Sequence, residues 1–126
     1  MKSFGDKDRL CFEVGDKKVG GLLPMEIYAA KESVTPFDKH AYLPSFIASL
    51  ERELDTIKKG GIPEEFIYFN HGPTTDDVYG KVAFINNEAK LTFEFRGEKQ
   101  VVVMLSVAEL IEIYNEVIIY LRELNA

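Results

Sequence analysis

Residues 82–105 read VAFINNEAKLTFEFRGEKQVVVML, and this stretch decides the fold. In its middle, at residues 91–95, apolar and polar side chains alternate, which is typical of a half-buried β-strand. Turn-forming residues stand on both sides, at 86–87 and 96–99, and each group separates this strand from another apolar run. The stretch therefore predicts three strands joined by two short turns, an antiparallel meander.

A helix is predicted directly after the meander, over residues 106–124. Ser106 is a natural N-cap, and Glu109 three residues later completes a capping box. Apolar residues at helical spacing form one broad face: Leu110, Tyr114, Val117, Ile118, Leu121 and Leu124. Glutamates gather on the opposite side: Glu109, Glu112, Glu116 and Glu123. The helix therefore presents one face to a core and an acidic face to its surroundings.

The first half of the chain predicts a second helix and further strands. After Pro44, apolar residues recur at helical spacing: Phe46, Ile47, Leu50, Leu54 and Ile57. Lysines and then glycines at 58–61 end this helix with cations in its last turn and a glycine C-cap. Strand-like runs stand at 9–14, 25–30 and 66–69, the last apolar on both faces as in a buried central strand. We therefore expect a single α+β domain over residues 1–126, with an antiparallel sheet of about five to six strands and two main helices on one face of it.

The composition is that of an acidic globular protein. The chain has 126 residues, of which 46% are hydrophobic and 12% aromatic, so a proper core can form and intrinsic disorder is disfavoured. There are 15 Lys and Arg against 21 Asp and Glu, a formal net charge of −6. This balance argues against a protein that tracks nucleic-acid phosphates and against docking on an anionic membrane. With one cysteine, Cys11, and no apolar leader at the N-terminus, we expect a cytoplasmic protein without disulfides.

The negative charge is concentrated in the second half of the chain. Residues 1–63 carry ten basic and ten acidic side chains, whereas residues 64–126 carry five basic and eleven acidic ones. Four of these eleven acidic residues belong to the last helix. Four others stand in one segment before the meander: Glu64, Glu65, Asp76 and Asp77. Concentrated charge of one sign shapes the field of a protein more than its total charge does. The two acidic segments therefore predict where a basic partner docks.

Residues 70–77 form the one long polar loop with a mixture of titratable side chains. His71 could act there as a general base oriented by Asp76 or Asp77, but the loop offers no convincing nucleophile beside it. The two histidines of the chain also lie far apart in sequence, without the short spacing of a metal-ligand motif. We therefore expect a surface loop and no catalytic site, metal or cofactor. A small enzyme that uses this loop ranks third among the functions considered, after the two binding functions given below.

Ile119 and Tyr120 border the acidic side of the last helix. An aliphatic and an aromatic residue surrounded by charge are typical of a protein-binding patch. Packing of Tyr120 at the edge of the sheet explains the pattern equally well, because scattered apolar residues on a surface are common. Both interpretations stay open at this point.

Three short motifs resemble bacterial immunity proteins. Residues 4–14, FGDKDRLCFEV, are similar to the openings of these small proteins, in which Phe-Gly-Asp precedes an alternating first strand. Residues 35–38, TPFD, and residues 42–46, YLPSF, which lead into the first helix, resemble them as well. Such proteins neutralise the toxin domains of contact-dependent inhibition and related polymorphic toxin systems.

The resemblance implies a small cytoplasmic inhibitor without catalysis, whose partner is a cognate toxin domain of basic, nuclease type. An acidic surface would steer such a toxin, and a few anchors would hold it with its active or substrate-binding site occluded. The candidate contacts are Glu64, Glu65, Asp76, Asp77, Glu109, Glu112, Glu116 and Glu123, and the candidate anchors are His71, Tyr79, Ile119 and Tyr120. The alternative is a small acidic adaptor or chaperone-like module that binds another protein through the same surface.

Overall fold

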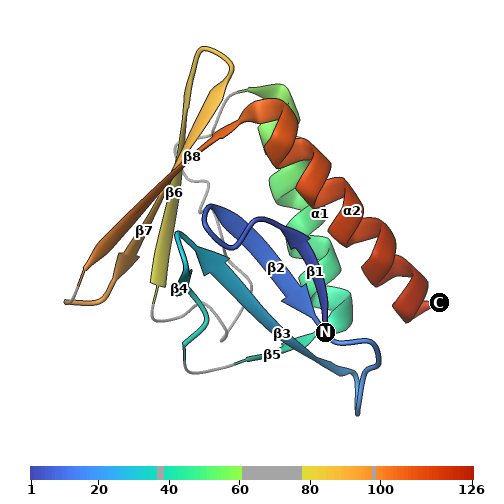
Figure 1. Ribbon diagram of the computed structural model, residues 1–126. Helices are drawn as coiled ribbons and strands as arrows, with labels where there is room; N and C mark the ends of the chain where they lie inside the picture. Colours follow the sequence, from blue (N-terminus) through green and yellow to red (C-terminus); the bar gives the residue numbers. More distant parts are fainter. Residues whose placement is uncertain (37–38, 61–77, 98) are drawn as a thin grey trace.

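The computed structural model describes residues 1–36, 39–60, 78–97 and 99–126. Along these residues the chain forms eight strands and two helices. Figure 1 shows the two helices side by side, with one sheet next to them and a second sheet at a steep angle to the first. Neither helix is long and apolar enough to cross a membrane.

The first five strands form one antiparallel sheet. They are β1 (Lys2–Gly5), β2 (Leu10–Val14), β3 (Leu22–Ala29), β4 (Glu32–Ser33) and β5 (His40–Tyr42). β3 is the long central strand, which pairs with β2 along most of its length and with β5 and β4 at its two ends. Alternate residues of β3 are buried, so one face of this sheet lies against the core and the other faces outward.

The last three strands form the predicted meander. They are β6 (Val78–Ile85), β7 (Glu88–Phe95) and β8 (Gln100–Ser106). Leu91 in the middle strand pairs with Val82 on one side and with Val103 on the other, so the inward-facing apolar residues align across the sheet. Asn86 adopts φ 58° in the first turn, a left-handed conformation that Asn tolerates better than most residues.

Both predicted helices are present, with the predicted ends. α1 (Leu43–Lys59) has a proline in its first turn and closes at Gly60, whose φ of 69° is left-handed. α2 (Val107–Asn125) begins at the capping box that Ser106 and Glu109 form. The local sequence signals at these helix ends were therefore sufficient to place them.

The core lies between the helices and the inner faces of both sheets. Tyr114 of α2 is fully buried and meets the ring of Phe12 of β2 edge-on, with the ring centroids 5.7 Å apart. Its hydroxyl donates a 2.8 Å hydrogen bond to Glu53 of α1, whose carboxylate is also fully buried. Phe93 brings the inner face of the three-stranded sheet into the same core cluster. One core therefore joins all the layers.

The predicted α+β class is confirmed, but the strands divide into two sheets instead of one. Among the described residues, β8 pairs with β7 and not with the first sheet, although it lies near β3. Each group of strands is consecutive in sequence and α1 separates them, so each pairs with its own neighbours. The strand predicted at 66–69 lies outside the described residues.

Candidate partner-binding surface

The glutamate face predicted for the last helix is present on α2. Glu112, Glu116 and Glu123 are exposed, and Glu109 in the first turn is about half-exposed, with 43% of its side-chain surface accessible. On the opposite side of the helix, five of the six predicted apolar residues are buried in the core, and Leu124 is partly buried against it. The amphipathic pattern of the sequence therefore translates directly into an acidic stripe on the surface of the molecule.

Glu109 is held from two directions. The Ser106 hydroxyl donates to its Oε1 at 3.1 Å. The Glu109 backbone N–H also donates to Ser106 Oγ at 3.1 Å and the Ser106 backbone N–H donates to Glu109 Oε1 at 3.4 Å, and these two bonds form the capping box. The guanidinium of Arg9 reaches both carboxylate oxygens, with Nη1 3.4 Å from Oε1 and Nη2 paired with Oε2. Glu109 thus joins the start of α2 to the loop between β1 and β2, 100 residues earlier in the chain.

These contacts shift the pKa values of both partners. The hydrogen bond from Arg9 lowers the pKa of Glu109 below its usual value, and the hydrogen bonds from Ser106 act in the same direction. Glu109 in turn raises the pKa of Arg9. The carboxylate of Glu109 is therefore charged at neutral pH, and so is the guanidinium of Arg9.

The turn that carries Arg9 requires a glycine. Gly5 has φ +97°, and a Cβ at this position would lie 2.2 Å from the carbonyl oxygen of Leu10. The Asp6 N–H donates to that same oxygen at 2.9 Å, and the Arg9 N–H donates to the Asp6 carbonyl at 2.9 Å. The backbone of the turn is therefore fixed, and it presents Asp6 and Arg9 toward α2.

A shallow groove lies between this turn and α2. Its volume is about 210 Å³, and it is lined by Gly5, Asp6, Arg9, Leu10, Leu105, Glu109, Glu112, Ile113 and Glu116. We call it the acidic groove, because four carboxylates and a single guanidinium give it a formal net charge of −3. Leu105 and Ile113 add an apolar floor to a negatively charged rim, a combination that suits the stem and head of a long cationic side chain.

The two apolar residues beside the glutamates have different environments. Tyr120 is half-buried: its hydroxyl donates to the Gly15 carbonyl at 3.0 Å, and its ring lies 5.4 Å from that of Phe4. Ile119 is 57% exposed and lines a second groove of about 270 Å³ between α1 and α2, beside the ion pair of Arg122 with Glu51. Tyr120 therefore packs at the edge of β1, whereas Ile119 is exposed on the surface.

Among the remaining predicted contacts that the structure describes, Tyr79 does not line the acidic groove. Tyr79 is 47% exposed on β6, in the three-stranded sheet. The structure gives no position for the other five, which lie outside the described residues: Glu64, Glu65, His71, Asp76 and Asp77. In the described part of the chain, no group of three or more His, Cys, Asp or Glu side chains could hold a metal ion.

Apart from Tyr79, the exposed apolar side chains on the two outer strands of the three-stranded sheet were not predicted. Tyr79, Ile85, Val102 and Met104 occupy outward-facing positions and are each between 43% and 54% exposed. The sequence signal existed, because Val102 and Met104 lie between the buried residues of β8 and must point the other way. The continuous apolar run 101–105 concealed this alternation.

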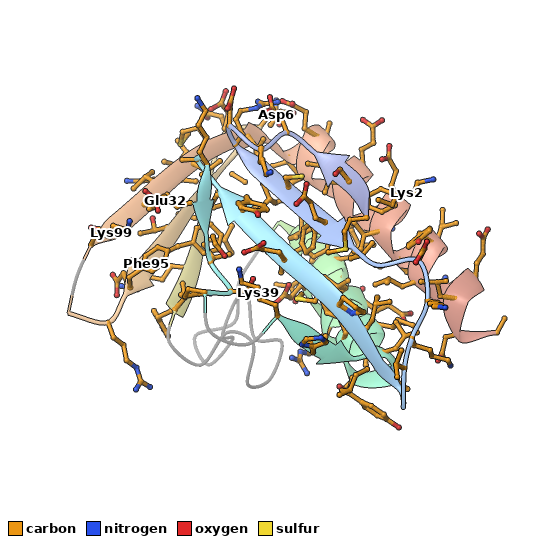
Figure 2. All side chains as sticks on the ribbon, turned by 60° about the horizontal axis from the view of Figure 1, so that its bottom comes forward. Lys2, Asp6, Glu32, Lys39, Phe95 and Lys99 are labelled. Atoms are coloured by element: carbon orange, nitrogen blue, oxygen red, sulfur yellow. The ribbon has the colours of Figure 1, made fainter. Side chains whose placement is uncertain are left out.

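A polar network on the outer face of the five-stranded sheet was also missed. Glu26 accepts hydrogen bonds from Tyr28 at 2.7 Å and Ser33 at 2.8 Å, and forms an ion pair with Lys39 at 2.8 Å. Figure 2 looks onto this side of the molecule, with Lys39 labelled. Burial raises the pKa of Glu26, but the hydrogen bonds from Lys39, Tyr28 and Ser33 outweigh it, so the pKa is lowered. The network is fully paired and holds the strands together.

Fold and surface together define a small α+β protein with an acidic face on α2. The sequence matches no protein-family model and no curated protein. A crystal structure of CdiI from Burkholderia dolosa AUO158 is similar to the chain, with a TM-score of 0.67 and 13% sequence identity. The alignment covers 94% of this chain and 99% of that one, so the two proteins share a fold over most of their length.

Proposed function

We propose that this chain is an immunity protein that binds and neutralises a cognate bacterial toxin domain. The observation that carries the proposal is the likeness to CdiI, an immunity protein of contact-dependent inhibition, over nearly the full length of both chains. The motifs at residues 4–14, 35–38 and 42–46 support it independently, because they resemble immunity proteins at the level of sequence. In this proposal the protein acts in the cytoplasm, by occlusion and without catalysis.

The acidic face of α2 is the proposed docking surface. Glu112, Glu116 and Glu123 are exposed there without a cation seated on them in the described ion pairs, and the acidic groove adds Asp6 and Glu109. A field of one sign raises the rate of encounter with an oppositely charged partner. The toxin is therefore expected to present a basic surface, such as the substrate-binding groove of a nuclease, and docking would cover that groove.

The test begins with the toxin domain encoded next to this gene. The two purified proteins are expected to form a complex whose association rate falls as salt is raised from 50 to 500 mM, because exposed charges are screened over about 8 Å at physiological ionic strength. The same complex is expected to block the toxin's activity. A neighbouring gene that encodes no toxin, together with capture of a different protein by the acidic face, would support an adaptor instead.

A charge-matched pair of variants locates the surface. Glu112→Gln with Glu116→Gln is expected to slow association several-fold, roughly the effect that removing two steering charges has. The control is Glu88→Gln with Asp16→Asn, which removes two exposed carboxylates outside α2, one at the start of β7 and one in the bend after β2, and changes the net charge equally. Equal slowing in both variants would show that total charge, and not this face, steers the toxin.

A further inference from the structure

We propose that Arg9 is an internal counter-ion that occupies the acidic groove in the free protein and is displaced by an arginine or lysine side chain of the partner. The inference rests on the proposed function, because it places the basic partner at the acidic face. It adds a mechanism that the fold alone does not imply. In the free protein Arg9 pairs with Glu109, so a cation of the partner has to compete with Arg9 for this carboxylate. Arg9 thereby weakens binding and restricts it to cations that pair better than Arg9 does.

The contact itself shows which ligand the groove accepts. Arg9 and Glu109 meet through two nitrogens and two oxygens, the fork-to-fork arrangement that guanidinium and carboxylate groups form best. With Arg9 in place the groove still has a net charge of −3, since Asp6, Glu112 and Glu116 also line it. A second cation is therefore attracted to a groove in which one guanidinium is already seated.

Glu109 stays in position when Arg9 leaves. Ser106 holds its Oε1 through the hydroxyl at 3.1 Å, and the capping box fixes the backbone around it. Oε2, the oxygen that pairs with Arg9 Nη2, takes no part in the cap. The acceptor is therefore preorganised, and displacement of Arg9 does not require the start of α2 to unfold.

Arg9 can leave by rotating its side chain alone. Its side chain is 42% exposed and that of Glu109 is 43% exposed, so water competes for both groups and the pair is only weakly held. The backbone of the turn stays fixed by the hydrogen bonds between Asp6 and its neighbours. The exchange therefore involves side chains only. This agrees with an association rate that is limited by diffusional encounter with the partner.

The experiment uses the full chain and an amidated tri-arginine peptide as the probe. The peptide is titrated at low salt while the backbone amide signals are followed by NMR. We expect the largest shifts at Asp6 and at residues 105–116, which surround the groove. Arg9→Gln is expected to bind the peptide about threefold more tightly, because it removes a like charge a few ångströms from the bound cation.

Lys99→Gln is the matched control. Lys99 forms an ion pair with Glu32 in which both side chains are 46% exposed, close to the exposure of the Arg9 pair, but it lies at the junction of β4 with the other sheet (Figure 2). Lys99→Gln lowers the net charge by the same amount as Arg9→Gln, but Lys99 does not line the acidic groove. The threefold gain in peptide affinity should therefore be absent. Arg9→Lys keeps the charge and loses the fork, and is expected to fall between wild type and Arg9→Gln.

Three results would overturn the inference: equal or weaker binding by Arg9→Gln with the circular dichroism spectrum unchanged, an equal gain in Lys99→Gln, or peptide shifts centred away from the groove. If Arg9→Gln unfolds, Arg9→Lys decides alone, and affinity unchanged from wild type then counts against the proposal. These outcomes are distinct from failure of the proposed function. A toxin complex whose affinity is the same in wild type and Arg9→Gln would overturn only the inference. Peptide binding at the groove without any toxin complex would overturn only the immunity role.

Discussion

At the scale of single residues, two glutamates face each other across the β2–β3 ladder. Glu13 pairs with Glu26 in the register of the strands, and like charges in directly opposite positions destabilise a sheet. The surrounding side chains compensate, because Lys39 pairs with Glu26 at 2.8 Å and Lys7 with Glu13 at 3.7 Å. The Tyr28 hydroxyl completes the arrangement by donating to Glu26, which raises the pKa of Tyr28 from its ordinary value near 10 to about 12.

Tyr28 should therefore titrate well above the ordinary pKa of a tyrosine side chain. Its phenol is expected to ionise near pH 12 in the absorbance at 295 nm, and Tyr28→Phe should remove that late component. Because the folded-state pKa is raised, the stability it contributes is present below pH 10 and is lost as the pH rises toward 12. Tyr42→Phe, at a tyrosine that is 56% exposed, is the control. A titration above pH 11 that is the same in wild type and Tyr28→Phe would contradict this assignment.

At the scale of the elements, the two helices begin in different ways. α2 starts with a complete capping box at Ser106 and Glu109, whereas the N-cap of α1 is Tyr42, which makes no side-chain capping hydrogen bond. α1 relies instead on the proline in its first turn and on burial of its apolar face. Of the two helices, only α2 is therefore stabilised at its start by side-chain capping hydrogen bonds.

Replacing that side chain should be measurable. Ser106→Ala is expected to lower the free energy of unfolding by about 1 kcal/mol in urea denaturation, the usual effect of removing an N-cap. Ser45→Ala in the first turn of α1 is the control, since its hydroxyl donates to the Tyr42 carbonyl and caps no N–H. Its effect should be clearly smaller. Equal losses in both variants would show that the capping box contributes nothing particular.

At the scale of the whole molecule, the two sheets share one core. Phe12 in the first sheet and Phe93 in the second are both fully buried in the same cluster. The Glu32–Lys99 ion pair, at 2.8 Å, also ties β4 to the turn between β7 and β8 (Figure 2). This packing favours the predicted single domain, in which neither sheet is stable without the other.

Cooperative unfolding tests that arrangement. Phe93→Ala is expected to cost about 3–5 kcal/mol, the usual loss for a buried phenylalanine. Hydrogen exchange should then show faster exchange in β2 and β3 as well as in β7, because one core unfolds as a unit. Val102→Ala on the outward face is expected to change stability by less than about 1 kcal/mol. Faster exchange confined to the three-stranded sheet would show two separate folding units.

Local patterns predicted the meander, both helices and the acidic face of α2. The alternation at 91–95 and the Ser106–Glu109 spacing depend on neighbouring residues alone, so they are visible in the sequence. The pairing of Arg9 with Glu109 joins residues 100 positions apart, and no local signal announces it. The same holds for the division into two sheets, because long-range pairing decides which strands become neighbours.

The double use of Glu109 has a consequence for how this surface can diverge among related genes. A change at 109 alters the groove, and any replacement other than glutamine also removes one half of the helix cap and so costs stability. Glu112 and Glu116 are exposed one and two turns further along and carry no such second duty in the described hydrogen bonds. A lineage that acquires a new partner can therefore change positions 9, 112 and 116, while position 109 stays limited to residues that complete the cap of α2.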